Sequence, residues 1–331
     1  GKRYRVVAYA DPSNPSSILS KLSTTDGGTY SADAKRLDSV TQWGANRWTS
    51  LTEAFRECSR MDVTATDVPD LRGVNNLSNM FYDCDSLVYN PTINTWSTDS
   101  ITNMRYMFWG AKVFNQPIGS WNTAKVEKME VMFCEAEAFN QDISGWNTAK
   151  VENMGGMFSG AKAFDKPIGS WNTAKVRDMG GMFLGAEAFN QPLNNWNTAN
   201  VFNMTGMFAN TKAFNQPIGN WNVEGVQRIA GMFRNAEAFD QDLSSWKLIS
   251  IINIDTIFKA PLNKGMSCSN YSKTLQGWAN NPLTKTGLNF IGQLNRNYNI
   301  IGKEARDILT KAVAQGGKGW TINGDTYDQY C

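Results

Sequence analysis

Hydrophobic residues recur along this chain at a fixed interval of 25 residues. Two residue types mark the interval: Trp96, Trp121, Trp146, Trp171, Trp196, Trp221 and Trp246, and Phe108, Phe133, Phe158, Phe183, Phe208, Phe233 and Phe258. Weaker units around Phe55 and Phe81 precede this array, so the recognisable repeats run over residues 51–260, about eight to nine units. A period of 20–29 residues with apolar residues at fixed phase is typical of the leucine-rich-repeat size class.

One repeat is too small to bury its own apolar side chains. Stacking repeats end to end would join them into a continuous core. This interpretation places Trp121, Trp146, Trp171, Trp196, Phe133, Phe158 and Phe183 in the core. The Met-Phe segment, with its nearby glycines, predicts a short helical turn. The Phe-Asn-Gln-Pro-Ile segment predicts an extended stretch that ends or bends at the proline. The predicted fold is an α/β repeat solenoid, a leucine-rich-repeat-like stack with short parallel strands and short helical turns.

The two ends of the chain depart from the repeat, as expected for segments that cover the ends of a stack. Residues 1–50 are predicted to form an N-terminal cap, with an edge strand over residues 5–10 and a Pro/Ser-rich loop over residues 11–15. Residues 261–331 are predicted to form a C-terminal cap. Its pattern predicts two short helices, over residues 269–279 and 303–313, and a final strand over residues 320–322.

The repeat resembles that of the BspA-like leucine-rich-repeat surface proteins of bacteria. Residues 151–158 read Val-Glu-Asn-Met-Gly-Gly-Met-Phe, and Phe164 and Trp171-Asn172-Thr173 complete a close copy of that family's motif. The resemblance implies an extracellular or cell-surface location and an adhesion or ligand-binding role, without a catalytic residue. The motif changes near the end of the array, at Val223, at residues 229–230 and at residues 247–249, where the last units would adapt to the cap.

Composition narrows the possible chemistry. The 331 residues carry a net charge of +2, which gives no electrostatic reason to expect nucleic acid as a partner. Histidine, the commonest general base and metal ligand, is absent. No apolar stretch is long enough to cross a bilayer, so no membrane insertion is expected within this chain. We expect no enzyme activity, no cofactor and no metal site.

Polar positions that vary between repeats are the predicted ligand contacts. One column, directly after the repeated Asn or Asp, contains Gln116, Gln141, Lys166, Gln191 and Gln216. Trp109 breaks the period and is the candidate exposed aromatic residue, although it could equally fill a surface groove. The Asn residues after each Trp are expected to bond their own turns.

The five cysteines leave two questions open. Cys268 and Cys331 flank the C-terminal cap and could form a disulfide that staples it. Cys58 and Cys84 occupy one core column of neighbouring repeats, either as buried thiols or as a bonded pair. The favoured function is recognition of a protein or glycan ligand on another cell or matrix. The alternative is a passive spacer or scaffold within a larger surface protein.

Overall fold

A computed structural model describes residues 25–26, 29–30, 34–45, 47–88, 90–293 and 296–331. The chain divides into two compact units, Gly1–Pro167 and Ile168–Cys331. Each unit is described by itself. The predicted edge strand over residues 5–10 and the loop over residues 11–15 lie outside the described residues.

The first unit contains few regular elements before its repeats begin. Its strands and short helices are β1 (Thr25–Asp26), β2 (Thr29–Tyr30), the 3-10 helix η1 (Ala34–Arg36), β3 (Ser39–Val40), β4 (Asp62–Val63) and the 3-10 helix η2 (Ile93–Thr95). Strands β1 and β2 pair antiparallel, whereas β3 and β4 pair in parallel. The parallel pair joins two successive stretches of chain in the same direction, and the repeats continue this arrangement.

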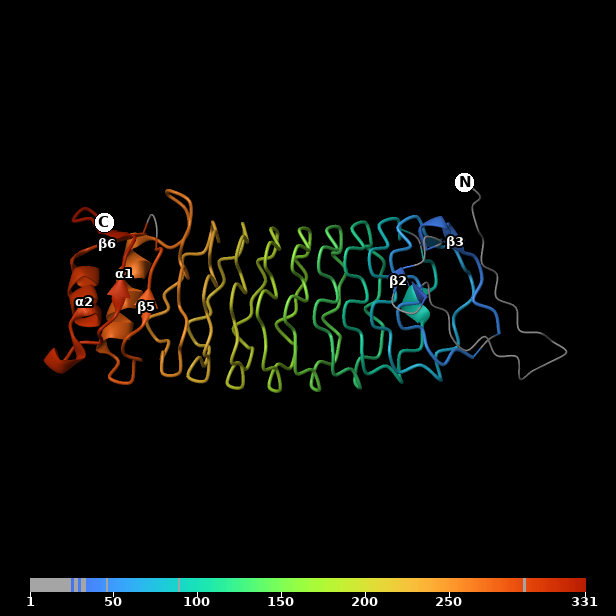
Figure 1. The fold of residues 1–331 in the computed structure, drawn as a ribbon, viewed down its shortest axis with the longest axis horizontal. Helices are drawn as coiled ribbons and strands as arrows, with labels where there is room; N and C mark the ends of the chain where they lie inside the picture. The colour runs from blue at the N-terminus through green and yellow to red at the C-terminus, as the bar shows by residue number, and fades with distance from the viewer. Residues whose placement is uncertain (1–24, 27–28, 31–33, 46, 89, 294–295) are drawn as a thin grey trace. The chain divides into compact units, whose positions relative to one another are not determined.

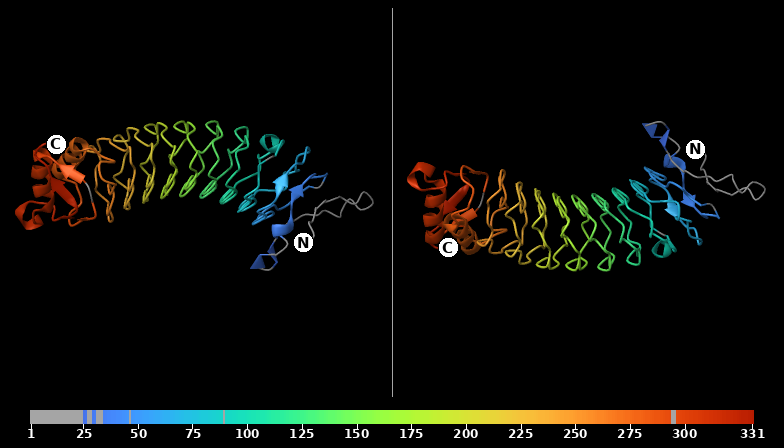
Figure 2. Two further views of the ribbon diagram at one scale, coloured as in Figure 1. Left: turned by 90° about the horizontal axis from the view of Figure 1, so that it is seen from above. Right: turned by 90° about the horizontal axis from the view of Figure 1, so that it is seen from below.

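Within each unit the repeats lie side by side in sequence order (Figures 1 and 2). Single parallel bridges link them, for example Lys128 to Asn153 in the first unit and Asp178 to Asn203 in the second. Short parallel contacts were predicted, but in the repeats that follow β4 the described contacts are isolated bridges rather than strands.

The Met-Phe segment is a chain of β-turns rather than the predicted short helical turn. Its backbone N–H groups alternate between two directions. The N–H of Met132 donates to Met129 O within the repeat, whereas the N–H of Phe133 donates to Met157 O of the next repeat, at 2.9 Å. A helix would send every N–H to a carbonyl of its own segment. The alternation therefore lets one segment turn tightly and bond its neighbour at the same time.

Each of these turns places one residue in the left-handed region, where glycine is favoured. Glycine fills one such position in four repeats, with φ near +60° at Gly156, Gly181, Gly206 and Gly231. Val131 occupies the same position with φ +60°. A β-branched residue is strained in this region, because its Cβ approaches the following carbonyl.

We therefore expect the Val131→Gly substitution to stabilise the protein. The free energy of unfolding should rise by about 1 kcal/mol, since release of the strain outweighs the greater flexibility of glycine in the unfolded chain. Thermal melting of the two proteins would measure the change. Ala138→Gly, at a half-buried position of negative φ in the same repeat, is the control and should lower stability instead. A lower melting temperature for Val131→Gly would contradict the argument.

The core consists of aromatic and aliphatic columns that run from repeat to repeat. Phe133 and Phe158 are fully buried, with ring centroids 5.7 Å apart, and Trp121 and Trp146 are stacked at 6.3 Å. In the second unit, Phe183, Trp171 and Trp196 are 0%, 3% and 4% exposed. Each ring contacts its counterparts in the neighbouring repeats, so the repeats share one core and depend on each other for stability.

Charges of opposite sign alternate along one surface column: Asp85, Lys112, Glu137, Lys162, Glu187, Lys212, Glu237 and Lys264. Within the column, Lys162 Nζ lies 2.8 Å from Glu137 and Lys212 Nζ lies 2.6 Å from Glu187. These side chains are exposed, so each ion pair contributes only about 0.2–1 kcal/mol. The sequence of charges therefore repeats every two units rather than every one.

The C-terminal cap contains the α-helices of the described residues and two small parallel sheets (Figure 1). Its elements are α1 (Cys268–Asn280), β5 (Asn289–Phe290), β6 (Arg296–Tyr298), α2 (Ile300–Thr310), the 3-10 helix η3 (Val313–Gln315), β7 (Thr321–Ile322) and β8 (Asp325–Tyr327). Strand β5 pairs with β7, and β6 pairs with β8. Two helices were predicted here, but α2 begins three residues earlier than expected because the Asn299 side chain accepts hydrogen bonds from the N–H groups of Ile301 and Gly302.

Three buried polar side chains tie the elements of the cap together. The hydroxyl of Tyr271 in α1 donates to Asp325 Oδ2 in β8 at 2.9 Å, and Arg306 Nε in α2 donates to Asp325 Oδ1 at 3.2 Å. A disulfide also joins Cys268 to Cys331, with their Cα atoms 5.8 Å apart.

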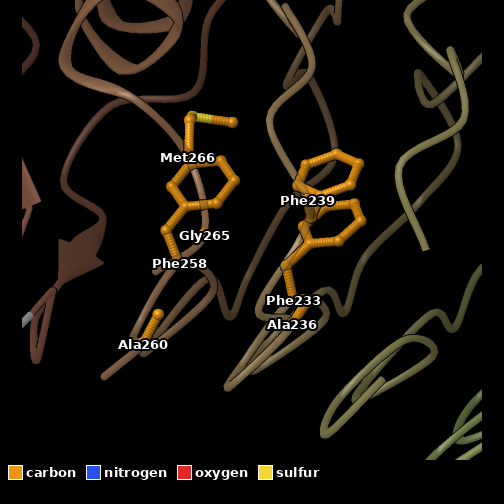
Figure 3. A pocket seen from close by; sticks show the side chains of 7 residues that line it. All are labelled: Phe233, Ala236, Phe239, Phe258, Ala260, Gly265 and Met266. Atoms are coloured by element: carbon orange, nitrogen blue, oxygen red, sulfur yellow. The ribbon is translucent and has the colours of Figure 1, made fainter. Parts of the chain in front are cut away.

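The cap continues the core of the last repeats without a break. Seven residues surround the junction: Phe233, Ala236, Phe239, Phe258, Ala260, Gly265 and Met266 (Figure 3). The space between them does not hold a water molecule. Trp278 of α1 stacks on Phe258, with ring centroids 6.0 Å apart. This junction is therefore packed core rather than a ligand pocket.

Candidate functional site

The predicted ligand contacts of the Gln column are engaged in hydrogen bonds between repeats. Gln141 Nε2 donates to both the carbonyl and the side-chain oxygen of Asn115, at 2.8 and 3.0 Å. Gln216 makes the same two contacts with Asn190, and Gln116 donates to the carbonyl of Val88. The repeated Asn residues also accept the backbone N–H of the next repeat. These amides stabilise the stack, so their presence at the surface is explained without a ligand.

Two members of the predicted column differ from the others in what the structure shows of them. Lys166 is half-buried, and its charge contributes to lowering the pKa of Asp142, after the larger effects of the Ser144 backbone and side chain. Gln191 occupies the corresponding position in the next repeat. Neither residue lines a groove or cavity that the structure describes.

Trp109 is half-buried rather than openly exposed. Its ring stacks on Tyr82 with centroids 4.3 Å apart, and the guanidinium of Arg56 lies 4.0 Å from the centre of the Tyr82 ring. The neighbouring ring therefore covers part of the Trp109 surface. This arrangement corresponds to the filled surface groove that the sequence left as an alternative.

Two regular sets of hydrogen bonds run along the edge of each repeat that carries Trp. Each indole N–H donates to the carbonyl 28 residues earlier, as Trp196 does to Ile168 at 3.1 Å. Each Thr hydroxyl of the Trp-Asn-Thr turn donates to the Asn carbonyl of the following repeat, as Thr198 does to Asn222 at 2.8 Å. The Asn side chain closes its own turn by accepting an N–H two residues later. Together these bonds hold neighbouring turns close to each other.

The Thr and Asn bonds stop in the last part of the array. Val223 stands where earlier repeats have Thr and has no hydroxyl to donate. Lys247 stands where they have Asn and cannot accept the N–H of its turn, which bonds the Lys247 carbonyl from Ile249 at 2.9 Å instead. These two changes were visible in the sequence as departures from the motif. Their consequence for the surface could be seen only when both repeats were placed side by side.

A groove of about 250 Å³ lies where these bonds stop. Eight residues line it: Gly219, Asn220, Trp221, Asn222, Val223, Glu224, Ser245 and Lys247. Trp221 and Val223 are 4% and 1% exposed, so they supply an apolar floor beneath polar walls. Sequence analysis did not single out this groove.

The polar side chains of the groove keep unused hydrogen-bonding capacity. Asn222 uses its side-chain oxygen for the Glu224 N–H at 3.0 Å, and Asn220 uses its amide N–H for the Asn194 carbonyl at 2.8 Å. Ser245 donates its hydroxyl to Gly219 O at 2.5 Å. The Asn222 amide hydrogens, the Asn220 oxygen and the Ser245 lone pairs are thus uncommitted among the contacts of the described residues.

One ion pair lies beside these groups. Lys247 Nζ is 2.8 Å from Glu224 Oε1, and the two side chains are 55% and 45% exposed. Both charged groups remain accessible to solvent and to a ligand. The groove therefore offers donors and acceptors in a small space, with a single positive and a single negative charge that balance each other.

The remaining chemistry-bearing residues form no second site in the described part of the chain. Within those residues, no group of three or more His, Cys, Asp and Glu side chains could hold a metal ion. Cys58 and Cys84 are buried free thiols, and Cys84 Sγ lies 3.1 Å from the Phe55 carbonyl. Burial raises the pKa of the Cys84 thiol well above its ordinary value. Among the described residues, no helix is both long and apolar enough to span a bilayer.

Comparison with known proteins places the repeats in one family. No curated protein and no solved structure matches the chain. A family described as "Mycoplasma protein of unknown function, DUF285" matches twice, over residues 49–170 and 152–278. The two matches overlap and together cover more than half of the chain, including both repeat segments and the groove. The chain therefore belongs to this DUF285 family of repeat-containing proteins.

Proposed function

We propose that this protein is a cell-surface or secreted adhesion module that binds a protein or glycan ligand through the surface of its repeats. The groove between residues 219–224 and 245–247 carries the proposal, because its polar groups keep hydrogen-bonding capacity that the fold does not use. Resemblance of the repeat motif to BspA-like surface proteins supports the location and a leucine-rich-repeat-like solenoid fold. The role is binding rather than catalysis, since the one acidic side chain that lines the groove is paired with Lys247.

A spacer or scaffold is the second candidate function. The inter-repeat bonds of Gln141 and Gln216, with the alternating charge column, favour it because they use surface side chains to hold the stack rather than to contact a ligand. A spacer would have no discrete ligand and would tolerate substitutions throughout its surface.

Binding of the purified full chain to arrays of glycans and of host and matrix proteins tests the proposal. We expect specific binding, and we expect Lys247→Ala to weaken it by about tenfold, as for the loss of one charged contact. Lys212→Ala is the matched control: Lys212 is 56% exposed and forms a similar ion pair, at 2.6 Å, away from the groove. Absence of binding to every glycan and protein would favour the spacer. Equal loss with both variants would remove the groove from the proposal.

A further inference from the structure

We infer that the groove at Trp221 recognises a single sugar ring within a glycan, a conclusion that rests on the proposed binding function and names its ligand. The inference begins with size. Pockets for drug-sized ligands occupy about 300–1,000 Å³, whereas this groove encloses about 250 Å³. A helix or a folded peptide segment is too large to enter it, but one ring fits.

The pattern of donors and acceptors selects the chemical class. Every sugar hydroxyl both donates and accepts a hydrogen bond. The groove presents uncommitted donors on Asn222 and Lys247, and uncommitted acceptors on Asn220 and Ser245. Adjacent hydroxyls of a ring can therefore each find a partner of both kinds. A hydrocarbon ligand would leave these polar groups without partners, which costs free energy.

The charge of the groove favours an uncharged sugar over an acidic one. Glu224 lies 2.8 Å from Lys247 and neutralises it, so the site holds no net positive charge for a carboxylate or sulfate. The paired groups can still contact hydroxyls, since a carboxylate accepts and an ammonium donates strong hydrogen bonds. The apolar floor of Trp221 and Val223 suits the C–H face of the ring.

The groove is local to the repeats in which the Thr and Asn bonds stop. At the preceding turn, Thr198 donates to Asn222 across the repeat boundary and Asn197 closes its own turn. The Val223 and Lys247 turns lack both contacts. One ring-sized site per chain follows, rather than a row of equal sites along the described repeats.

Saturation-transfer NMR of the full chain with free glucose, galactose, mannose and N-acetylglucosamine, together with a printed glycan array, tests the inference. We expect signal from at least one neutral sugar. Asn222→Ala should weaken binding about tenfold, as for the loss of one or two hydrogen bonds. Ser245→Tyr should abolish it by filling the groove from an exposed position. Ser170→Tyr, at the corresponding exposed position of an earlier repeat, should bind like the parent chain.

The possible outcomes separate this inference from the broader function. Binding to host or matrix proteins without any sugar signal would overturn the sugar site and leave the adhesion proposal standing. A sugar signal that survives Ser245→Tyr, with circular dichroism showing a folded protein, would also overturn it. Loss of signal with Ser245→Tyr but not with Ser170→Tyr supports the site. No binding of any kind would overturn both proposals.

Discussion

Replacing Phe208 with alanine is expected to lower the free energy of unfolding by about 3–5 kcal/mol, the range for removal of a buried phenylalanine ring. Phe208 is fully buried in the second unit. Its ring lies 3.9 Å from Phe214, 5.5 Å from Phe183 and 5.8 Å from Phe233, measured between centroids. The substitution removes contacts within one repeat and with both adjacent repeats, and the rigid stack leaves a cavity that cannot collapse.

The effect on cooperativity should be as clear as the effect on stability. Stacked repeats are held by contacts between nearest neighbours, so a weak interface can divide one transition into two. Urea unfolding followed by fluorescence would show a second, earlier step in Phe208→Ala. Phe202→Ala is the control, because Phe202 is a half-buried phenylalanine of the same repeat and should change stability by only about 1 kcal/mol. Equal losses for the two variants would contradict the assigned core.

The second large effect is expected in the C-terminal cap, at the buried Asp325. Its side chain is 0% exposed and holds both Arg306 and Tyr271. Asp325→Ala leaves the Arg306 charge without its partner and the Tyr271 hydroxyl without an acceptor. Breaking a buried ion pair in this way costs about 3–5 kcal/mol.

The helical signal provides a direct readout of this variant, since the α-helices of the described residues, α1 and α2, both lie in the cap. Circular dichroism at the helical minimum, recorded against denaturant, should show the cap of Asp325→Ala unfolding at a lower concentration. Asp307→Ala provides a matched control on α2: the Lys303–Asp307 pair has the same 3.2 Å separation, but its side chains are 50% and 64% exposed. That change should cost at most about 1 kcal/mol. A similar midpoint for Asp325→Ala and the parent protein would contradict the assigned network.

The repeat period and its core columns could be predicted from the sequence because an interval of 25 residues repeats the same apolar types many times. The form of the turns could not. A helical turn and a chain of β-turns both bury Met154, Met157 and Phe158, so the apolar pattern does not distinguish them. The positive φ angles of Gly156 and Gly160 decide between the two. Glycine in the sequence was compatible with either structure.

The candidate site was harder to predict for a related reason. Gln141 and Gln216 are polar and variable in context, as ligand contacts are, yet their amides bond a residue 26 positions earlier. Sequence does not show which side chains find such partners. The groove depends on two substitutions, Val223 and Lys247, that were recognised as departures from the motif. Their joint effect required knowledge that the two turns are neighbours.

The alternating charge column has a consequence for how the gene of such a protein can grow or shrink. Removing a single 25-residue block around Lys212 would place Glu187 next to Glu237, so that two negative charges replace an attractive contact. Removing two consecutive blocks would restore a neighbour of opposite sign. Each mismatch is small, but it acts on every chain that is made. Selection on this surface therefore favours duplication and deletion in steps of 50 residues, and the heritable unit is a pair of repeats.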